Sequence, residues 1–115
     1  MIKLYREVLD SPELLAAGVL RVADLLLGSK SPIIFTGAGL STGSGVPDYR
    51  SGSETQIRTG PGVWSTPSEL RPGIYNGDRP GVVRAHAALP NESHIMIREL
   101  LEKGLAFKVG PFGGG

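Results

Sequence analysis

Glycine is concentrated in the middle of this chain and limits what the chain can fold into. Ten of the 17 glycines lie between Gly37 and Gly81, in a sequence of 115 residues. Glycine adopts backbone conformations that other residues avoid, and it lets the main chain approach a neighbour or a ligand closely. Residues 43–80 are therefore predicted to form a long region of turns. A compact domain usually keeps such a stretch only where it serves a function, and otherwise the stretch is disordered.

Segments with regular apolar periodicity lie on both sides of this loop region. On the upstream side, Ser11-Pro12-Glu13 is a typical helix start, and apolar residues recur at helical spacing through 12–27. Gly28 then offers a left-handed stop for this helix. Residues 32–36 are short, apolar and rich in β-forming side chains, which predicts a strand that is buried on both faces.

On the downstream side, Asn91 is expected to cap a helix that ends at Gly104, and residues 105–109 predict a second strand. The order is therefore helix, strand, glycine turn, long insert, helix and strand. It predicts an α/β fold, namely an incomplete Rossmann-like (doubly wound) fold with one βαβ crossover, an N-terminal helix and a long glycine-rich loop region. The crossover should be right-handed and the two strands parallel. Residues 1–109 would form one partial domain, and 110–115 a flexible glycine-rich tail that cannot continue the strand.

The apolar residues of the two predicted strands suit a larger sheet than two strands can form. They include Ile33, Ile34, Phe35 and Phe107. A two-stranded parallel pair leaves both of its edges and much apolar surface exposed. We therefore expect this piece to be marginally stable by itself or to associate with another chain.

Composition excludes several classes of function. Twelve Lys and Arg residues against 11 Asp and Glu give a net charge of +1, which argues against direct nucleic-acid binding and against a polybasic membrane-surface protein. Without cysteine there is no disulfide, thiolate nucleophile or cysteine-ligated zinc site. The apolar stretch 14–27 is too short to span a bilayer, and charged residues interrupt any signal peptide at the start. We expect an intracellular protein, in the nucleus or the cytoplasm.

A glycine turn directly after the first predicted strand carries the strongest chemical signal. Glycines at the carboxyl end of a parallel strand let backbone N–H groups approach a diphosphate, and the following helix start adds positive potential. The usual dinucleotide fingerprint wants a third glycine or alanine where this chain has Thr42. No lysine follows the glycines, so the P-loop pattern also fails. Spacing alone leaves a glycine-rich structural turn as an equal alternative.

The wider sequence around this turn resembles the signature of the sirtuins, the NAD-dependent protein deacylases. The resemblance rests on Gly37-Ala38-Gly39-Leu40-Ser41-Thr42, followed by Ser44-Gly45-Val46-Pro47-Asp48-Tyr49-Arg50. The agreement is nearly complete over residues 37–51. Weaker support comes from Gly62-Val63-Trp64 and from 90–104, where His94 stands at a commonly matching position.

The resemblance implies NAD as the cofactor and assigns roles to single residues. The residues that would approach the NAD diphosphate are Gly37, Ala38, Gly39 and Ser41, and Thr42 would lie near it. The loop that would fold over the nicotinamide ribose contains Asp48, Tyr49 and Arg50. The residue types suit these roles, because Arg50 supplies a permanent charge for phosphate or ribose oxygens and Tyr49 a flat lid that excludes water. Trp64 is either part of the cofactor-pocket wall or a buried packing anchor.

Neither histidine is expected to be catalytic. His94 fits a packing or hydrogen-bonding role at a helix start, and His86 lies in a loop without a carboxylate at suggestive spacing. No cluster of His, Asp and Glu has the spacing of a metal site. In the sirtuins the catalytic histidine and the cysteine-ligated zinc module follow later in the sequence, so the resemblance covers only the first part of the catalytic domain. Zinc is thus expected in the family, without ligands in this chain.

We therefore predict the NAD-binding portion of a protein-lysine deacylase, inactive alone. The family reaction would be acyl-lysine removal with release of nicotinamide, or ADP-ribosyl transfer, with an acyl-lysine protein as the partner. One alternative is a non-catalytic module that binds NAD or ADP-ribose and regulates another protein. Another is a structural domain whose glycine loop has no ligand.

Overall fold

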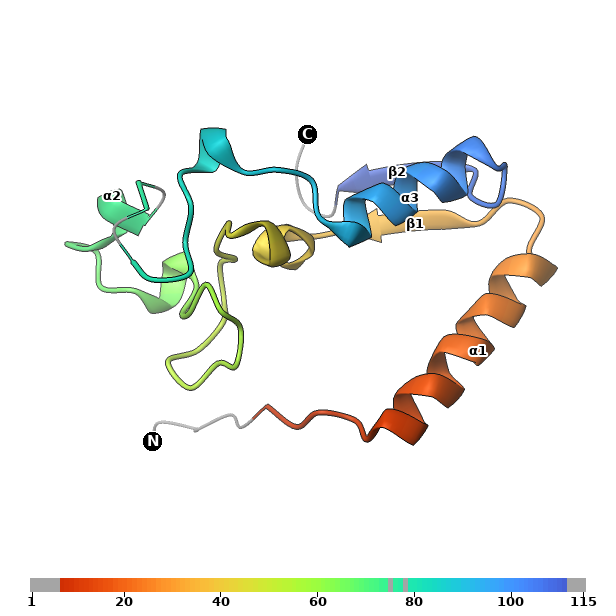
Figure 1. Ribbon diagram of the computed structural model, residues 1–115, viewed down its shortest axis with the longest axis horizontal. Coiled ribbons are helices and arrows are strands. Elements are labelled where there is room, and N and C mark those ends of the chain that lie inside the picture. The colour runs from red at the N-terminus through yellow and green to blue at the C-terminus, as the bar shows by residue number, and fades with distance from the viewer. Residues whose placement is uncertain (1–6, 75, 78, 112–115) are drawn as a thin grey trace. The chain divides into compact units, whose positions relative to one another are not determined.

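The structure is a computed structural model that describes residues 7–74, 76–77 and 79–111 (Figure 1). The chain divides into two units. The first, called here the loop unit, combines Met1–Glu7 with Gly37–His94, and the second, the sheet unit, combines Val8–Thr36 with Ile95–Gly115. The candidate site residues all lie in the loop unit.

The sheet unit begins with helix α1 (Pro12–Gly28), at the position that the sequence predicts. The Ser11 side chain accepts a hydrogen bond from the backbone N–H of Leu14 (3.2 Å), and a proline follows as the first helical residue. The predicted left-handed stop at Gly28 is wrong, since the helix is capped by Ser29 in an extended conformation. The Ser29 hydroxyl donates to the Leu25 carbonyl (2.7 Å) and satisfies the helix end without a left-handed residue.

Two parallel strands form the sheet, as the sequence predicts. Strand β1 (Ile33–Thr36) pairs with β2 (Lys108–Pro111), with Ile33 opposite Lys108 and Thr36 opposite Pro111. Between the strands along the chain lies helix α3 (Glu92–Glu102) (Figure 1). The predicted βαβ order is therefore present, and the observed elements are compatible with a partial Rossmann-like fold.

Strand β2 starts three residues later than the sequence predicts and continues through Gly110-Pro111, which the sequence analysis excluded from it. The N–H groups of Leu105 and Ala106 both donate to the Leu100 carbonyl, so these residues close α3 and cannot join the sheet. A proline is tolerated in an edge strand because its missing N–H can face away from the partner. The remaining predicted tail, residues 112–115, lies outside the described residues.

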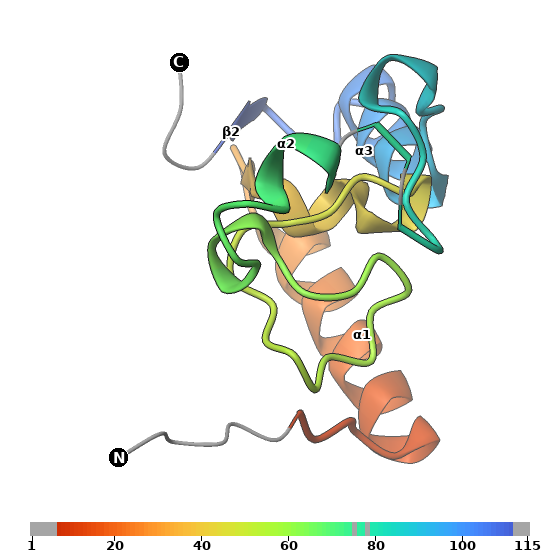
Figure 2. The same cartoon turned by 90° about the vertical axis from the view of Figure 1, so that its left-hand side faces the viewer.

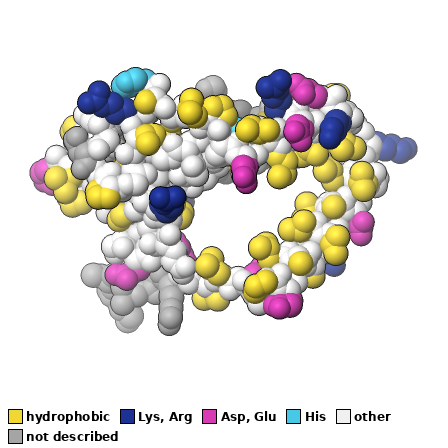
Figure 3. Space-filling model, in the orientation of Figure 1, with side chains coloured by type: hydrophobic (Ala, Val, Ile, Leu, Met, Phe, Trp, Pro, Cys, Tyr) yellow, Lys and Arg dark blue, Asp and Glu magenta, His cyan; other side chains and the backbone are white. Residues whose placement is uncertain are grey.

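The sheet unit leaves most of its apolar side chains exposed. In β1, Ile33 is 54% exposed and Phe35 is 72% exposed, so the strand is not buried on both faces within the described residues. Figure 3 shows hydrophobic side chains along the surface of α1, none of whose residues is buried. None of the helices in the described ranges is long and apolar enough to cross a membrane.

The loop unit consists of irregular backbone with short helical turns (Figure 2). These turns are η1 (Ala38–Ser44), η2 (Val63–Ser65), α2 (Arg71–Ile74) and η3 (Ala85–Ala87). Most of the buried side chains of the described residues belong to this unit, namely Pro47, Thr59, Thr66, Ile74 and Val82. Several of its glycines hold left-handed conformations, as the glycine content predicts: Gly45, Gly60, Gly77 and Gly81.

Replacing Gly81 with alanine should destabilise the loop unit. Gly81 has φ of +82°, and an added Cβ would lie 2.1 Å from the carbonyl oxygen of Arg58. We expect Gly81→Ala to lower the free energy of unfolding by about 2 kcal/mol or more. Urea denaturation followed by tryptophan fluorescence measures the loss. Gly52→Ala, which has no atom within 4 Å of the added Cβ, is the control. Equal unfolding midpoints for the two variants would contradict the described backbone.

Candidate functional site

The predicted glycine turn is present as a tight 3₁₀ helix that follows β1 directly. Helix η1 begins after Gly37, whose backbone is extended, and ends at Gly45, which has φ of +87°. The Gly37 carbonyl accepts the N–H of Leu40 (3.2 Å), and the Thr42 hydroxyl donates to the Gly39 carbonyl (2.9 Å). The turn therefore holds its own shape through local hydrogen bonds, and the Thr42 hydroxyl is part of them.

Gly37 and Gly39 have no structural need to be glycine within the described residues. Neither adopts a left-handed conformation, and a Cβ at either position would meet no atom within 4 Å. Gly62 and Gly81 behave differently, because a Cβ there would collide with backbone atoms at 2.3 Å and 2.1 Å. Packing explains glycine at 62 and 81. At 37 and 39 the open space above the turn leaves room for a ligand to reach the backbone.

The loop that carries Asp48, Tyr49 and Arg50 is paired with the segment that carries Trp64. The N–H of Gly62 donates to the Ser51 carbonyl (2.8 Å), and the N–H of Trp64 donates to the Tyr49 carbonyl (2.8 Å). Two sequence stretches that resemble the family separately are therefore brought side by side. Four of the residues that the sequence assigns to the cofactor therefore lie in one cluster, namely Asp48, Tyr49, Arg50 and Trp64.

The side chains of this cluster form an exposed aromatic and cationic surface. The Tyr49 and Trp64 rings lie with centroids 5.4 Å apart at an angle of 33°, and the Arg50 guanidinium carbon lies 5.1 Å from the Trp64 ring centroid. Tyr49 is 49% exposed and Trp64 is 59% exposed. Trp64 is therefore not the buried packing anchor that was one of its two predicted roles. Such a surface can stack on a planar ring and offer a charge to phosphate or hydroxyl oxygens.

Asp48 shapes the loop in the described structure. One of its carboxylate oxygens accepts the backbone N–H of Ser51 (3.3 Å), and the other accepts the Ser51 hydroxyl. Its backbone carbonyl accepts the N–H of Val63 (2.9 Å). The carboxylate therefore closes the turn that presents the next two residues, which is a common role for aspartate in loops.

The start of α3 is hydrogen-bonded to the glycine turn. Asn91 caps the helix as predicted, since its side-chain oxygen accepts the N–H groups of Ser93 (2.9 Å) and His94 (3.2 Å). Its side-chain amide donates to the Leu40 carbonyl (2.7 Å), a contact that the sequence did not suggest. His94 has the hydrogen-bonding role expected of it, because its Nε2 lies 3.2 Å from the Ser41 hydroxyl. These contacts fix one side of the turn.

The hydrogen bonds of His94 indicate which ring nitrogen carries the proton when the ring is neutral. Its Nδ1 accepts the backbone N–H of Asn91 (3.0 Å), so in the neutral ring the proton is on Nε2, and Nε2 donates to Ser41. A ring nitrogen that already carries a proton cannot remove one from the serine. The pair is therefore not a serine nucleophile with its base. A cavity of about 280 Å³ lies beside it, lined in part by Ser41, Ser44 and His94.

The described residues do not fit the zinc module that the family resemblance implies. Among them no group of three or more His, Cys, Asp and Glu side chains could hold a metal ion, and the sequence has no cysteine. His86 is exposed in η3 and makes no hydrogen bond to the residues the structure describes.

Comparison with known proteins gives relatives that are named as NAD-dependent protein deacetylases. No family model and no solved structure matches the chain. The chain is 37% identical to the NAD-dependent protein deacetylase SRT1 of Oryza sativa over 85% of its length, and 36% identical to an NAD-dependent protein deacetylase of Sulfurisphaera tokodaii over 74%. It is 32% identical to human NAD-dependent protein deacetylase sirtuin-7 over 86%. The chain belongs to the sirtuin family.

The relatives are much longer than this chain. The matched sirtuin residues are 18% of the Oryza protein, 35% of the Sulfurisphaera protein and 21% of the human protein. Within this chain, the similarity extends well beyond residues 37–51 and covers 74–86% of the sequence.

The Glu7 carboxylate anchors the loop that follows Arg50, and its contacts predict a pH dependence. Glu7 accepts the N–H of Gln56 (2.9 Å) and the hydroxyl of Thr55 (2.8 Å). The hydrogen bond from Gln56 is the main cause that holds the Glu7 pKa below its ordinary value of 4.5, and the bond from Thr55 lowers it further. The contribution of Glu7 to loop stability is therefore fully present above pH 4.5 and is lost as the pH falls through the lowered pKa.

Acidification should release this loop. We expect the amide proton of Gln56 to exchange faster with solvent as the pH falls through the lowered Glu7 pKa, after correction for the intrinsic exchange rate. Amide exchange measured by NMR tests this expectation. In Glu7→Gln, whose side chain does not titrate, the corrected exchange should not change with pH. The same pH profile in both proteins would show that Glu7 does not hold the loop.

Proposed function

We propose that this chain binds NAD. The diphosphate would lie on the turn at 37–42, and the nicotinamide ribose under the Asp48–Arg50 loop with Trp64 beside it. The observation that carries the proposal is the open space at Gly37 and Gly39, where glycine is needed neither for packing nor for backbone conformation. The relatives support it, because their names state dependence on NAD.

Each predicted contact has a defined task in this proposal. The backbone N–H groups of the turn at Gly37, Ala38 and Gly39 would approach the diphosphate oxygens, as such turns do in dinucleotide sites. The Ser41 hydroxyl, which accepts from His94, can donate its own proton to an oxygen of the ligand. Thr42 would stay near the diphosphate while its hydroxyl supports the turn.

The aromatic cluster would serve the other end of the cofactor. Arg50 is held against Trp64 and offers a guanidinium fork to ribose or phosphate oxygens. Tyr49 lies beside the same indole ring and would exclude water from the ribose carbon. Asp48 would act through the loop shape that its bonds to Ser51 maintain.

We infer that the site belongs to a protein-lysine deacylase reaction in which the acyl-lysine protein is the second substrate. Bound NAD would supply an electrophilic ribose carbon, from which nicotinamide leaves as the acyl oxygen of a lysine attacks. The chain's residues would bind and orient the cofactor and keep water away from it. General-base catalysis needs a side chain that can accept a proton. His94 does not offer one in its described hydrogen bonds, and among the residues that the structure describes His86 has no hydrogen-bond partner that would orient it.

The 115 residues by themselves therefore fit cofactor binding better than turnover. The two hydrogen bonds of His94 are the observation that favours a non-catalytic NAD- or ADP-ribose-binding module as the second candidate function. Both candidates share the same site, and they differ in whether the chain alone turns over an acyl-lysine substrate.

Gly39→Ala should weaken NAD binding without destabilising the fold. The added methyl group has room in the free protein but would stand where the diphosphate approaches. We expect the Kd for NAD, measured by calorimetry, to rise about tenfold or more, with the free energy of unfolding unchanged within about 0.5 kcal/mol. Arg50→Ala should raise the Kd by a similar factor, through loss of a charge-assisted hydrogen bond.

Gly18→Ala provides the matched control for the glycine variant. Gly18 lies in α1, and its Cβ would also meet no atom within 4 Å. We expect this variant to bind NAD as the wild-type chain does, and ADP-ribose to compete with NAD in both. Absence of a saturable heat signal with both ligands would refute the binding proposal. An unchanged Kd for Gly39→Ala would show that the diphosphate does not bind at the turn.

The chain alone should not remove the acetyl group from an acetyl-lysine peptide in the presence of NAD. Without a general base among the described histidines we expect a rate reduced by at least about 10²–10⁴-fold relative to a complete active site. Chromatographic detection of the deacetylated peptide measures the rate. Deacetylation that depends on NAD and disappears in Arg50→Ala would contradict the expectation and establish a catalytic chain.

A further inference from the structure

A short segment of the loop unit, Arg79–Val83, bonds to residues that adjoin both halves of the proposed NAD site. At one end, the N–H of Val83 donates to the Gly45 carbonyl (2.9 Å), directly after the glycine turn. The Val83 side chain fills the space where a Gly45 side chain would lie, since an added Cβ would be 2.9 Å from it. The turn is therefore fixed against this segment.

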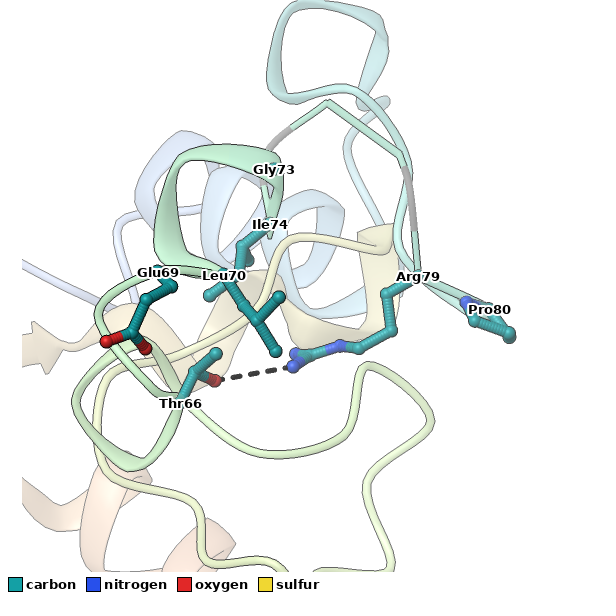
Figure 4. A pocket seen from close by; sticks show the side chains of 7 residues that line it. All are labelled: Thr66, Glu69, Leu70, Gly73, Ile74, Arg79 and Pro80. Carbon is teal, nitrogen blue, oxygen red and sulfur yellow. Dashed lines mark hydrogen bonds between the residues drawn. The ribbon is translucent and has the colours of Figure 1, made fainter.

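At the other end, the Arg79 guanidinium holds the stretch that leads into the Trp64 segment. Its Nη2 donates to the carbonyls of Thr59 (2.5 Å) and Pro61 (2.6 Å). Figure 4 shows its contact with Thr66, whose hydroxyl lies 3.5 Å from Nη1. That hydroxyl donates to the Gly62 carbonyl (2.8 Å). Arg79 thus holds Gly62 from two sides, directly through the backbone that precedes it and indirectly through Thr66.

The held stretch is the one that pairs with the cofactor loop. Gly62 bonds to the Ser51 carbonyl, and the next two N–H groups bond to the carbonyls of Asp48 and Tyr49. A chain of contacts therefore runs from Arg79 through residues 59–62 to the loop with Tyr49 and Arg50. Thr59 is fully buried, so its carbonyl has few alternative partners if the guanidinium is lost.

We propose that Arg79 is a positioning residue for NAD binding. It holds residues 59–62 so that the cofactor loop is formed before the ligand arrives, while Val83 keeps the same segment on the glycine turn. The role suits arginine, because a planar guanidinium donates in several fixed directions and a lysine ammonium cannot hold the same fork. The proposal rests on the proposed NAD-binding function and adds to it a residue that does not touch the ligand.

An Arg79 variant can lose the hydrogen bonds and keep the fold. A cavity of about 440 Å³ lies beside the guanidinium, with Leu70 and Ile74 in its wall (Figure 4). A methionine side chain can fill apolar gaps of this kind. Arg79→Met therefore removes the donors and leaves an unbranched apolar side chain, and Arg79→Lys restores an ammonium donor without the planar fork.

The chain's single tryptophan is Trp64, so its fluorescence reports on the held segment directly. In the absence of ligand, we expect Arg79→Met to lower the fluorescence anisotropy of Trp64 and to leave the far-ultraviolet circular dichroism unchanged. The Kd for NAD should rise about tenfold if one-tenth of the molecules keep the loop formed. Arg79→Lys should lie between Arg79→Met and wild type in both measurements.

Arg84→Met is the control, because the Arg84 side chain is exposed and makes no hydrogen bond to the described residues, while its backbone carbonyl, which accepts the N–H of Ala87, is unaffected by the substitution. It should match the wild-type chain in anisotropy and in NAD affinity. Unchanged anisotropy in Arg79→Met, or lowered anisotropy with unchanged NAD affinity, would overturn the positioning role. Loss of the circular dichroism signal in both Arg79 variants would assign a purely structural role and overturn it as well. Failure of the wild-type chain to bind NAD would instead overturn the proposed function, while the ligand-free anisotropy still decides whether Arg79 holds the segment.

Discussion

The main-chain pairing of residues 62–64 with residues 48–51 is the constraint on which the candidate site depends. Three backbone hydrogen bonds join the two stretches, and Gly62 lies so close to the backbone of Tyr49 that a side chain would not fit. This pairing brings Trp64 against Tyr49 and Arg50. Without it, Tyr49 and Arg50 would lose the indole ring of Trp64 beside them, and residues 48–51 would lose three backbone hydrogen bonds.

Two kinds of glycine in the middle of the chain differ in what surrounds them. One kind, exemplified by Gly62 and Gly81, lets backbone segments cross at contact distance. The other kind, Gly37 and Gly39, lies in open space at the turn after β1. The first kind builds the loop unit in the absence of regular sheet structure, and the second leaves a backbone surface free for a ligand. The same residue type therefore serves both stability and the proposed binding.

The sequence predicted the regular elements well where local signals define them. Ser11 starts α1, Asn91 starts α3 and Gly104 has the left-handed conformation expected after α3. The start of β2 was predicted too early, because the N–H groups just after Gly104 are used by the helix carbonyl of Leu100. That competition between helix end and strand start is not visible in the apolar pattern, which is continuous through both.

By itself, the sequence determined the family, the order of the elements and the helix caps, because motifs and caps depend on residues a few positions apart. Tertiary structure alone decided that Trp64 is exposed beside Arg50, that His94 donates to Ser41, and that Arg79 holds the backbone before Gly62. Those contacts join residues 14 to 53 positions apart through a loop without regular periodicity. The path of such a loop is fixed by close backbone crossings and buried carbonyls, and no short sequence pattern encodes them.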